Sequence, residues 1–278
     1  MKSQRLALIL GVFFVSFMFV APSFGIVSAA TPIVTLSGPR IPVDLASSSS
    51  LNWAGYAVTG TPGSITTVSG SFVQPSVTCS HKTTYAAFWA GIDGYNDNTV
   101  EQAGTLAECS SGSPVYLAWT EFYPAAPIYA SWSPSSGDLI SVTVTCSSIS
   151  GGASCTATVK DVTTGNSYSN QGSVSGAELA NAECIAERPA VGGSLTTLAN
   201  FGTAKYGQDY TSVSGTCYAG TGNTLQAFGS FSTVTSITMV NQKGQTLASP
   251  SSLSSDGSSF TATYASSSSP GGGHHGKP

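Results

Sequence analysis

The sequence predicts an all-β fold, a β-sandwich or barrel, and three observations support this prediction. Short runs alternate between apolar and polar residues with the two-residue period of a strand, and they are rich in β-branched and aromatic residues. Turn residues separate the runs, as at 164–166 (Thr-Gly-Asn). The clearest runs cover residues 139–144, 156–162, 228–240 and 260–264. Only residues 176–187 have a helix-like composition.

The chain divides into four parts, one of which is a folded domain. Residues 1–30 combine a basic start, an apolar run and small residues at the end, which are the features of a cleaved secretory signal. A membrane anchor is the alternative, but no basic stop-transfer cluster follows the run. Residues 31–50 are expected to be a short propeptide or linker, 51–264 one domain, and 265–278 a flexible tail. We therefore expect a secreted, extracellular protein with no stable membrane association after signal cleavage.

The charge of the chain is low. Charged residues make up 8% of the sequence and the net charge is −4, with no basic cluster, so a nucleic-acid partner is not expected. Aromatic residues make up 10%, which argues against disorder. With 13 Asp and Glu and three His, few groups change charge as the pH falls. This composition suits a protein that works in acid, and it equally suits a neutral secreted β-protein.

Six cysteines, an even number in a chain expected to be exported, predict disulfides. Cys146 and Cys155 flank a Gly-rich stretch and are placed to close a hairpin, and Cys79 and Cys109 bracket a tryptophan-containing segment. Other pairings remain open at this point. A zinc site is not expected, because the chain has no Cys-x-x-Cys pair and the domain has a single histidine. Neither a metal nor an organic cofactor is predicted.

Export and acid tolerance point to a hydrolase, yet the commoner catalytic motifs are absent. The chain has no G-x-S-x-G elbow, no H-E-x-x-H and no Asp-Thr-Gly or Asp-Ser-Gly, and His81 is the only base available to a serine triad. Carboxylates remain as candidates. Asp93, Glu121, Glu183 and Glu187 lie among aromatic or aliphatic residues, which favour the neutral form of a carboxyl group. Such groups suit acid–base work at low pH, and each also suits a purely structural role.

Seven short motifs follow one another across residues 51–264. They are Asn52-Trp53-Ala54-Gly55-Tyr56, Trp89-x-Gly91-Ile92-Asp93-Gly94, Thr99 with Gln102-x-Gly104, residues 118–124 (Ala-Trp-Thr-Glu-Phe-Tyr-Pro), Gly137-Asp138, Thr163-Thr164-Gly165, and Asn181-Ala182-Glu183-x-Ile185-x-Glu187. In this order they resemble the motifs of the glutamic peptidases known as eqolisins. Each motif alone is weak, but seven in the family's order are specific.

The resemblance implies a fold, a reaction and a site. The fold would be an antiparallel double-sheet β-sandwich, a concanavalin A-like jelly roll, which agrees with the strand pattern. The chain would be a monomeric, pepstatin-insensitive acid endopeptidase acting on proteins or peptides, and its short leader favours a prokaryotic source. Gln102 and Glu187 would be the catalytic pair, and Trp53, Trp89, Asp93, Trp119 and Glu121 would line or support the cleft.

The implied pair makes chemical sense. Glu187 as a carboxylate can take a proton from water and return it to the leaving amine, while the Gln102 amide donates to the developing oxyanion. Two positions depart from the family pattern. Arg188 replaces an acidic residue, and Cys184 replaces a bulky apolar one and is expected to pair with Cys217.

Two other functions compete with the peptidase. A jelly-roll glycoside hydrolase would use two carboxylates, such as Glu121 and Glu187, across an aromatic cleft. A non-catalytic carbohydrate-binding sandwich would need only exposed aromatic residues. Gln102 within its motif discriminates, because neither alternative requires it.

Overall fold

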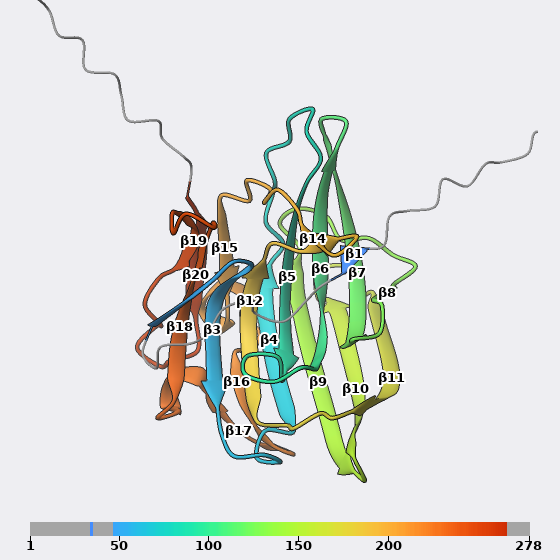
Figure 1. The fold of residues 1–278 in the computed structure, drawn as a ribbon, viewed down its shortest axis with the longest axis vertical. Coiled ribbons are helices and arrows are strands. Elements are labelled where there is room, and N and C mark those ends of the chain that lie inside the picture. The colour runs from blue at the N-terminus through green and yellow to red at the C-terminus, as the bar shows by residue number, and fades with distance from the viewer. Residues whose placement is uncertain (1–33, 36–46, 266–278) are drawn as a thin grey trace, which may run out of the picture. The chain divides into compact units, whose positions relative to one another are not determined.

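Strands form nearly all of the regular structure in the computed structural model, which describes residues 34–35 and 47–265 (Figure 1). The first layer contains, in order of pairing, β18 (Val234–Val240), β3 (Trp53–Thr59), β12 (Asn181–Glu187), β5 (Thr84–Ile92), β6 (Val100–Ser110), β7 (Ser113–Tyr123) and β8 (Ile128–Tyr129). The second contains β11 (Ser167–Ser175), β10 (Gly152–Asp161), β9 (Leu139–Ile149), β4 (Thr67–Val73), β16 (Tyr218–Thr221) and β17 (Thr224–Ala227).

The two layers are joined through β15 (Thr203–Tyr206), β20 (Phe260–Tyr264) and β19 (Thr246–Pro250), which lead from β4 to β18. Pairing between the described strands is antiparallel, except that β18 pairs in parallel with β2 (Ser47–Ser50). β1 (Val34–Thr35), β13 (Ala190–Val191) and β14 (Ser194–Leu195) form a small separate sheet. Within the described residues, helical structure is confined to α1 (Gln208–Thr211) and the 3-10 helix η1 (Phe228–Ser230). The predicted antiparallel β-sandwich is confirmed.

Two apolar clusters lie on opposite faces of the first layer. Successive residues of a strand point to opposite faces, so one strand contributes to both clusters. In β12, Ala182, Cys184 and Ala186 belong to the core between the layers, together with residues of β4, β9 and β10. Ile185 belongs to the second cluster, on the outer face, with Trp53 and other residues. The outer face of the first layer therefore also carries a buried apolar cluster.

The helix-like composition of residues 176–187 was misleading, because the structure places a strand, β12, over Asn181–Glu187. This strand is central: it pairs with β3 on one side and β5 on the other, and all seven of its residues are buried. Neighbouring strands satisfy its backbone along its whole length, and this tertiary pairing outweighs local propensity.

The predicted boundaries are only partly covered by the structure. The predicted signal, residues 1–30, and residues 266–278 of the predicted tail lie outside the described residues. Within the predicted propeptide or linker, Ser47–Ser50 and Val34–Thr35 are strands that pair with β18 and β13. Among the described residues, no helix has the length and apolar character needed to cross a membrane.

Two of the three expected disulfides are present. Cys146 and Cys155 are bonded across directly opposed positions of β9 and β10, and Cys79 is bonded to Cys109 of β6. Cys184 and Cys217 are instead buried free thiols, with their Sγ atoms 2.7 Å apart, so the expected third bridge is not formed in this structure. Burial raises the pKa of the Cys184 thiol well above its usual value, which disfavours the reactive thiolate.

We expect an oxidised small-molecule disulfide, such as oxidised glutathione, to join Cys184 and Cys217. The two thiols would lose two protons and two electrons and release two molecules of reduced glutathione, and the sulfurs need to approach by less than about 1 Å. Bridging residues 33 apart should stabilise the fold by about 3–4 kcal/mol. Thiol titration after denaturation should find two thiols before treatment and none after it. Two thiols that persist after oxidation in mild denaturant would show that the pair cannot bond.

Candidate active site

The strand register places the predicted site residues on the outer face of the first layer. Strands β12, β5, β6 and β7 are neighbours, so residues opposite one another form rows across the sheet. The first row is Glu183, Gly91, Gln102 and Glu121; the second is Ile185, Trp89, Gly104 and Trp119; the third is Glu187, Ala87, Leu106 and Leu117. Gln102 and Glu187 therefore share a face, with the tryptophan row between them.

Glu187 is buried and held by neighbouring side chains. The indole Nε1–H of Trp89 donates a hydrogen bond of 2.8 Å to Oε2, and Asn52 Nδ2 lies 3.5 Å from Oε1. Trp53 packs edge-on against Trp89, with ring centroids 4.9 Å apart. Because both indoles are fully buried, these contacts fix the orientation of the carboxyl group.

Gln102 is held by a different carboxylate. Its Nε2 donates a hydrogen bond of 2.7 Å to Oε2 of Glu121, which faces it across β6 and β7. A primary amide has two N–H groups, so one remains for another acceptor. Both residues are at most 1% exposed. The arrangement presents an oriented hydrogen-bond donor, the Gln102 amide, which does not itself titrate.

Glycine makes room for the tryptophan row. A Cβ at Gly104 would lie 2.1 Å from the Phe88 carbonyl oxygen and 2.6 Å from Trp89 Cβ, so any larger residue would push away the β5 backbone that carries Trp89. Trp119 lies on the other side of Gly104 in the same row, and its Nε1 is buried without a hydrogen-bond partner among the described residues.

Asp93 has a structural role away from the Glu187 carboxyl group. It follows β5 with a positive φ of 63°, and its carboxylate accepts the backbone N–H groups of residues 178–180 at 2.7–2.9 Å. These bonds fix the segment that leads into β12. Asp93 therefore supports the strand that carries Glu187.

A group of buried and half-buried acids lies near Asp93, and the sequence did not single out two of them, the half-buried Asp97 and the buried Glu101. Burial, followed by the charge of Asp93, raises the pKa of Asp97 to about 6 and that of Glu101 to about 9. Burial raises the pKa of Glu183 well above its usual value, and Asp97 and Asp93 add to the effect. Neither carboxyl oxygen of Glu183 has a hydrogen-bond partner among the described residues. These groups keep their protons to unusually high pH.

Asn52 was also missed as a site residue, although it stands in the first motif of the resemblance. Its contact with Glu187 spans 135 positions in sequence, so only the pairing of β3 with β12 brings the two together. Its side-chain Oδ1 accepts a hydrogen bond from Ser50, which orients the amide.

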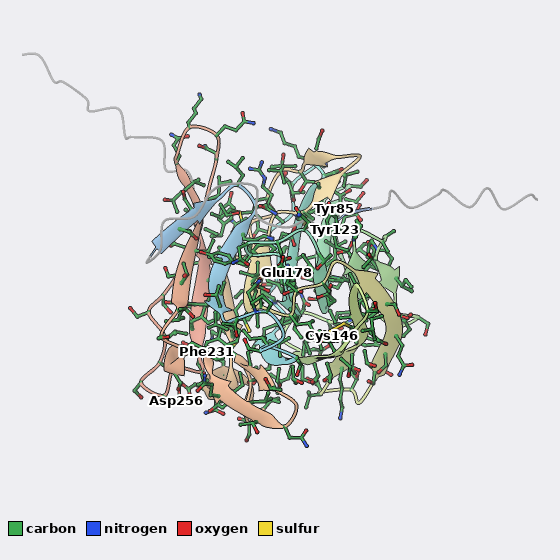
Figure 2. All side chains as sticks on the ribbon, turned by 60° about the horizontal axis from the view of Figure 1, so that its bottom comes forward. Tyr85, Tyr123, Cys146, Glu178, Phe231 and Asp256 are labelled. Carbon is green, nitrogen blue, oxygen red and sulfur yellow. A yellow bond between two sulfur atoms is a disulfide. The ribbon has the colours of Figure 1, made fainter. Side chains whose placement is uncertain are left out.

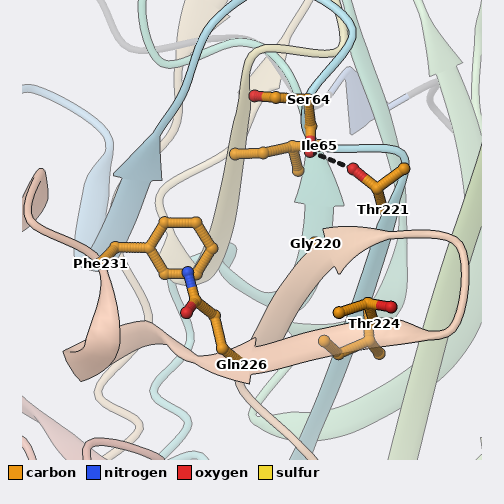
Figure 3. A pocket seen from close by; sticks show the side chains of 8 residues that line it. Ser64, Ile65, Gly220, Thr221, Thr224, Gln226 and Phe231 are labelled. Carbon is orange, nitrogen blue, oxygen red and sulfur yellow. Dashed lines mark hydrogen bonds between the residues drawn. The ribbon is translucent and has the colours of Figure 1, made fainter.

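The described residues offer no convincing metal site. One group of possible ligands combines Glu101 with Cys146 and Cys155, but these two sulfurs are bonded to each other and cannot act as thiolates. A separate hollow with a volume of about 370 Å³ lies against the β16–β17 hairpin (Figure 3). Thr221 donates to the Ser64 carbonyl at its edge, and its lining contains no titratable side chain, so it offers no acid–base chemistry.

The fold and the site together define a class: a β-sandwich protein with a carboxylate, an amide and tryptophan side chains on one sheet face. A model of the Peptidase A4 family matches residues 51–264, so the chain belongs to this family and is a peptide hydrolase. No curated protein has a significant match to the sequence.

Solved structures of the family share the fold. Scytalido-glutamic peptidase with a transition state analog inhibitor is 22% identical with a TM-score of 0.62, covering 77% of this chain and 98% of that one. SCP-B, a member of the eqolisin family, in a complex with the tripeptide Ala-Ile-His, is 22% identical with a TM-score of 0.58 and the same coverage. Aspergilloglutamic peptidase from Aspergillus niger is 30% identical with a TM-score of 0.53, covering 66% of this chain and 99% of that one. The family membership favours the peptidase over the glycosidase and the binding module.

Proposed function

We propose that the chain is a secreted acid endopeptidase that cleaves proteins by direct water attack, with Glu187 and Gln102 as its catalytic residues. The observation that carries this proposal is the shared sheet face on which Trp89 fixes the Glu187 carboxyl group and Glu121 fixes the Gln102 amide. The predicted signal and the two disulfides support export.

The reaction needs a base, an oxyanion donor and an acid. Glu187 takes a proton from water as the oxygen attacks the peptide carbonyl, and the N–H of Gln102 that is not bonded to Glu121 donates to the oxyanion. Glu187 then returns the proton to the amide nitrogen, the C–N bond breaks, and the carboxylate is restored. Scytalido-glutamic peptidase binds a peptide based transition state analog, which supports the same class of substrate here.

Glu121 has a positioning role in this mechanism. An amide side chain can rotate to exchange its oxygen and nitrogen, and the bond to Glu121 Oε2 keeps the nitrogen of Gln102 on one side. A water-activating base is already present in Glu187, so Glu121 need not exchange protons with the substrate.

We expect the secreted protein to cleave denatured haemoglobin or casein in acid, at about pH 3 where such substrates are unfolded. Pepstatin should have no effect, because the chain lacks the paired aspartates of an aspartic protease, and EDTA and serine-protease reagents should have none either. The measurement is release of acid-soluble peptides with and without each inhibitor.

The same assay separates the alternatives. Loss of activity in EDTA would point to a metal, and release of sugar from β-glucan or xylan without release of peptides would point to the glycosidase. Either result would overturn the proposed reaction.

A further inference from the structure

A polar hollow with a volume of about 430 Å³ begins one residue beyond Glu187. It is lined by Arg188, at the end of β12, and by four residues of the β18–β19 turn, Asn241, Gln242, Lys243 and Gln245. Four of these five side chains end in an amide or an ammonium group and the fifth in a guanidinium group. None is a carboxylate, so the lining is rich in hydrogen-bond donors.

Arg188 is attached to the same support as Glu187. Its backbone N–H donates a hydrogen bond of 2.7 Å to the Asn52 carbonyl, and the Asn52 side chain lies 3.5 Å from Glu187 Oε1. The Nε of Arg188 is buried and has no hydrogen-bond partner among the described residues. A buried guanidinium donor without an acceptor is costly, and burial lowers the pKa of Arg188. An anion in the hollow would offset this cost.

The second cationic residue of the hollow, Lys243, lies in the β18–β19 turn. Asn241 accepts the backbone N–H groups of Lys243 and Gln245 at 2.9 and 3.0 Å and donates its side-chain amide to Gln245, which fixes the turn. The residues of 47–265 include five Lys and Arg, namely Lys82, Lys160, Arg188, Lys205 and Lys243. Two of these five line one hollow, in a chain whose net charge is −4. Two like charges that line one hollow repel one another, and a bound anion would relieve this repulsion.

We propose that this hollow is a substrate subsite that binds a carboxylate of the peptide, either an Asp or Glu side chain or the free C-terminus. The proposal rests on the proposed peptidase function and adds a substrate preference to it. Arg188 is adjacent to Glu187, and an extended peptide advances about 3.3 Å per residue, so the bound carboxylate belongs within about three residues of the scissile bond. A guanidinium group matches the planar geometry of a carboxylate.

The test compares pairs of peptides that differ in one carboxylate. In an otherwise neutral peptide, each position in turn is Glu or Gln, and a second pair has a free or an amidated C-terminus. At about pH 5 a Glu side chain is mostly ionised, and wild-type kcat/KM at the best position should be about tenfold higher for the carboxylate than for the amide. The position and the pair that give the preference identify the source of the carboxylate. At about pH 3 the preference should fall, because the substrate carboxyl is protonated while Arg188 and Lys243 stay charged.

Variants of the hollow decide whether it causes the preference. Lys243 lies on an exposed turn, and Lys243→Gln should reduce the ratio of kcat/KM for the Glu and Gln peptides several-fold. Arg188→Gln should reduce this ratio to about one. Lys160→Gln is the matched control, because the Lys160 side chain is exposed on β10 away from the hollow lining, and it should keep the wild-type preference. If Arg188→Gln does not fold, Lys243→Gln alone carries the test.

Two outcomes would overturn the subsite. One is a wild-type ratio near one in every pair, and the other is a preference that survives in Lys243→Gln and Arg188→Gln. In either case the peptidase function would still be supported if the wild type cleaves the Gln peptide and Glu187→Gln does not. If the wild type cleaves no peptide in acid, both the peptidase function and the subsite are excluded.

Discussion

Glu187→Gln should leave no measurable peptidase activity while the protein stays folded. The substitution keeps the size of the side chain and a partner for the Trp89 indole, but it removes the only group proposed to move protons. Activity on denatured haemoglobin is the measurement, and the urea midpoint checks the fold. Glu178→Gln is the matched control, because Glu178, which is labelled in Figure 2, is exposed and bonds to Asp93 through its backbone N–H. An active Glu187→Gln enzyme would exclude Glu187 as the base.

Substitutions of Gln102 should lower the peptidase activity without abolishing it. Gln102→Ala removes the oxyanion donor and should lower kcat on the order of 10²-fold or more. Gln102→Glu places a second carboxyl group against Glu121, where the present distance is 2.7 Å, and two such groups share one proton. Some activity should therefore survive in acid and disappear as the pH rises. If Gln102→Ala is near wild type while Glu187→Gln is inactive, the partner of Glu187 must be another residue.

The sequence was sufficient for the fold class because alternation is a local signal. The runs at 139–144 and 260–264 lie in β9 and β20, and the turn predicted at 164–166 connects β10 to β11. Composition failed for β12, because a central strand buried on both faces carries no alternation, and its Ala and Glu residues are typical of a helix. Its identity depends on the flanking strands, which no local pattern contains.

Residues of the candidate site could be predicted only where they stand in one of the motifs. Trp89 and Glu121 stand in motifs, and the structure places them against Glu187 and Gln102. The Glu101 carboxyl group lies in the core between the layers, beside the disulfide of Cys146 and Cys155, which are distant from it in sequence. Burial of this kind is a property of packing between distant strands, so it could be found only in the structure.

The acids with raised pKa values make the stability of the fold depend on pH. Glu101, Glu183 and Asp97 have pKa values raised by burial and by neighbouring carboxylates, so the folded protein binds more protons than the unfolded chain at intermediate pH. Stability falls with pH wherever the folded state holds the extra protons. The contribution of Glu101 is complete below its ordinary value of 4.5 and is lost as the pH rises toward about 9, and that of Asp97 is lost between 3.8 and about 6. The direction is opposite to ordinary acid unfolding.

We therefore expect the free energy of unfolding to decrease steeply from about pH 4 to about pH 8. At about 1.4 kcal/mol per pH unit, Glu101 alone accounts for a loss on the order of 5 kcal/mol between its ordinary pKa of 4.5 and pH 8, which is comparable to the whole stability of many domains. Urea midpoints across this range are the measurement. Glu101→Gln and Glu183→Gln mimic the protonated acids and should each flatten the pH dependence, whereas the exposed Glu178→Gln should follow the wild type. A wild-type stability that is constant or rises toward pH 8 would show that the buried acids release their protons without cost to the fold. The same slope of unfolding free energy against pH in all three variants would show that other groups take up the protons.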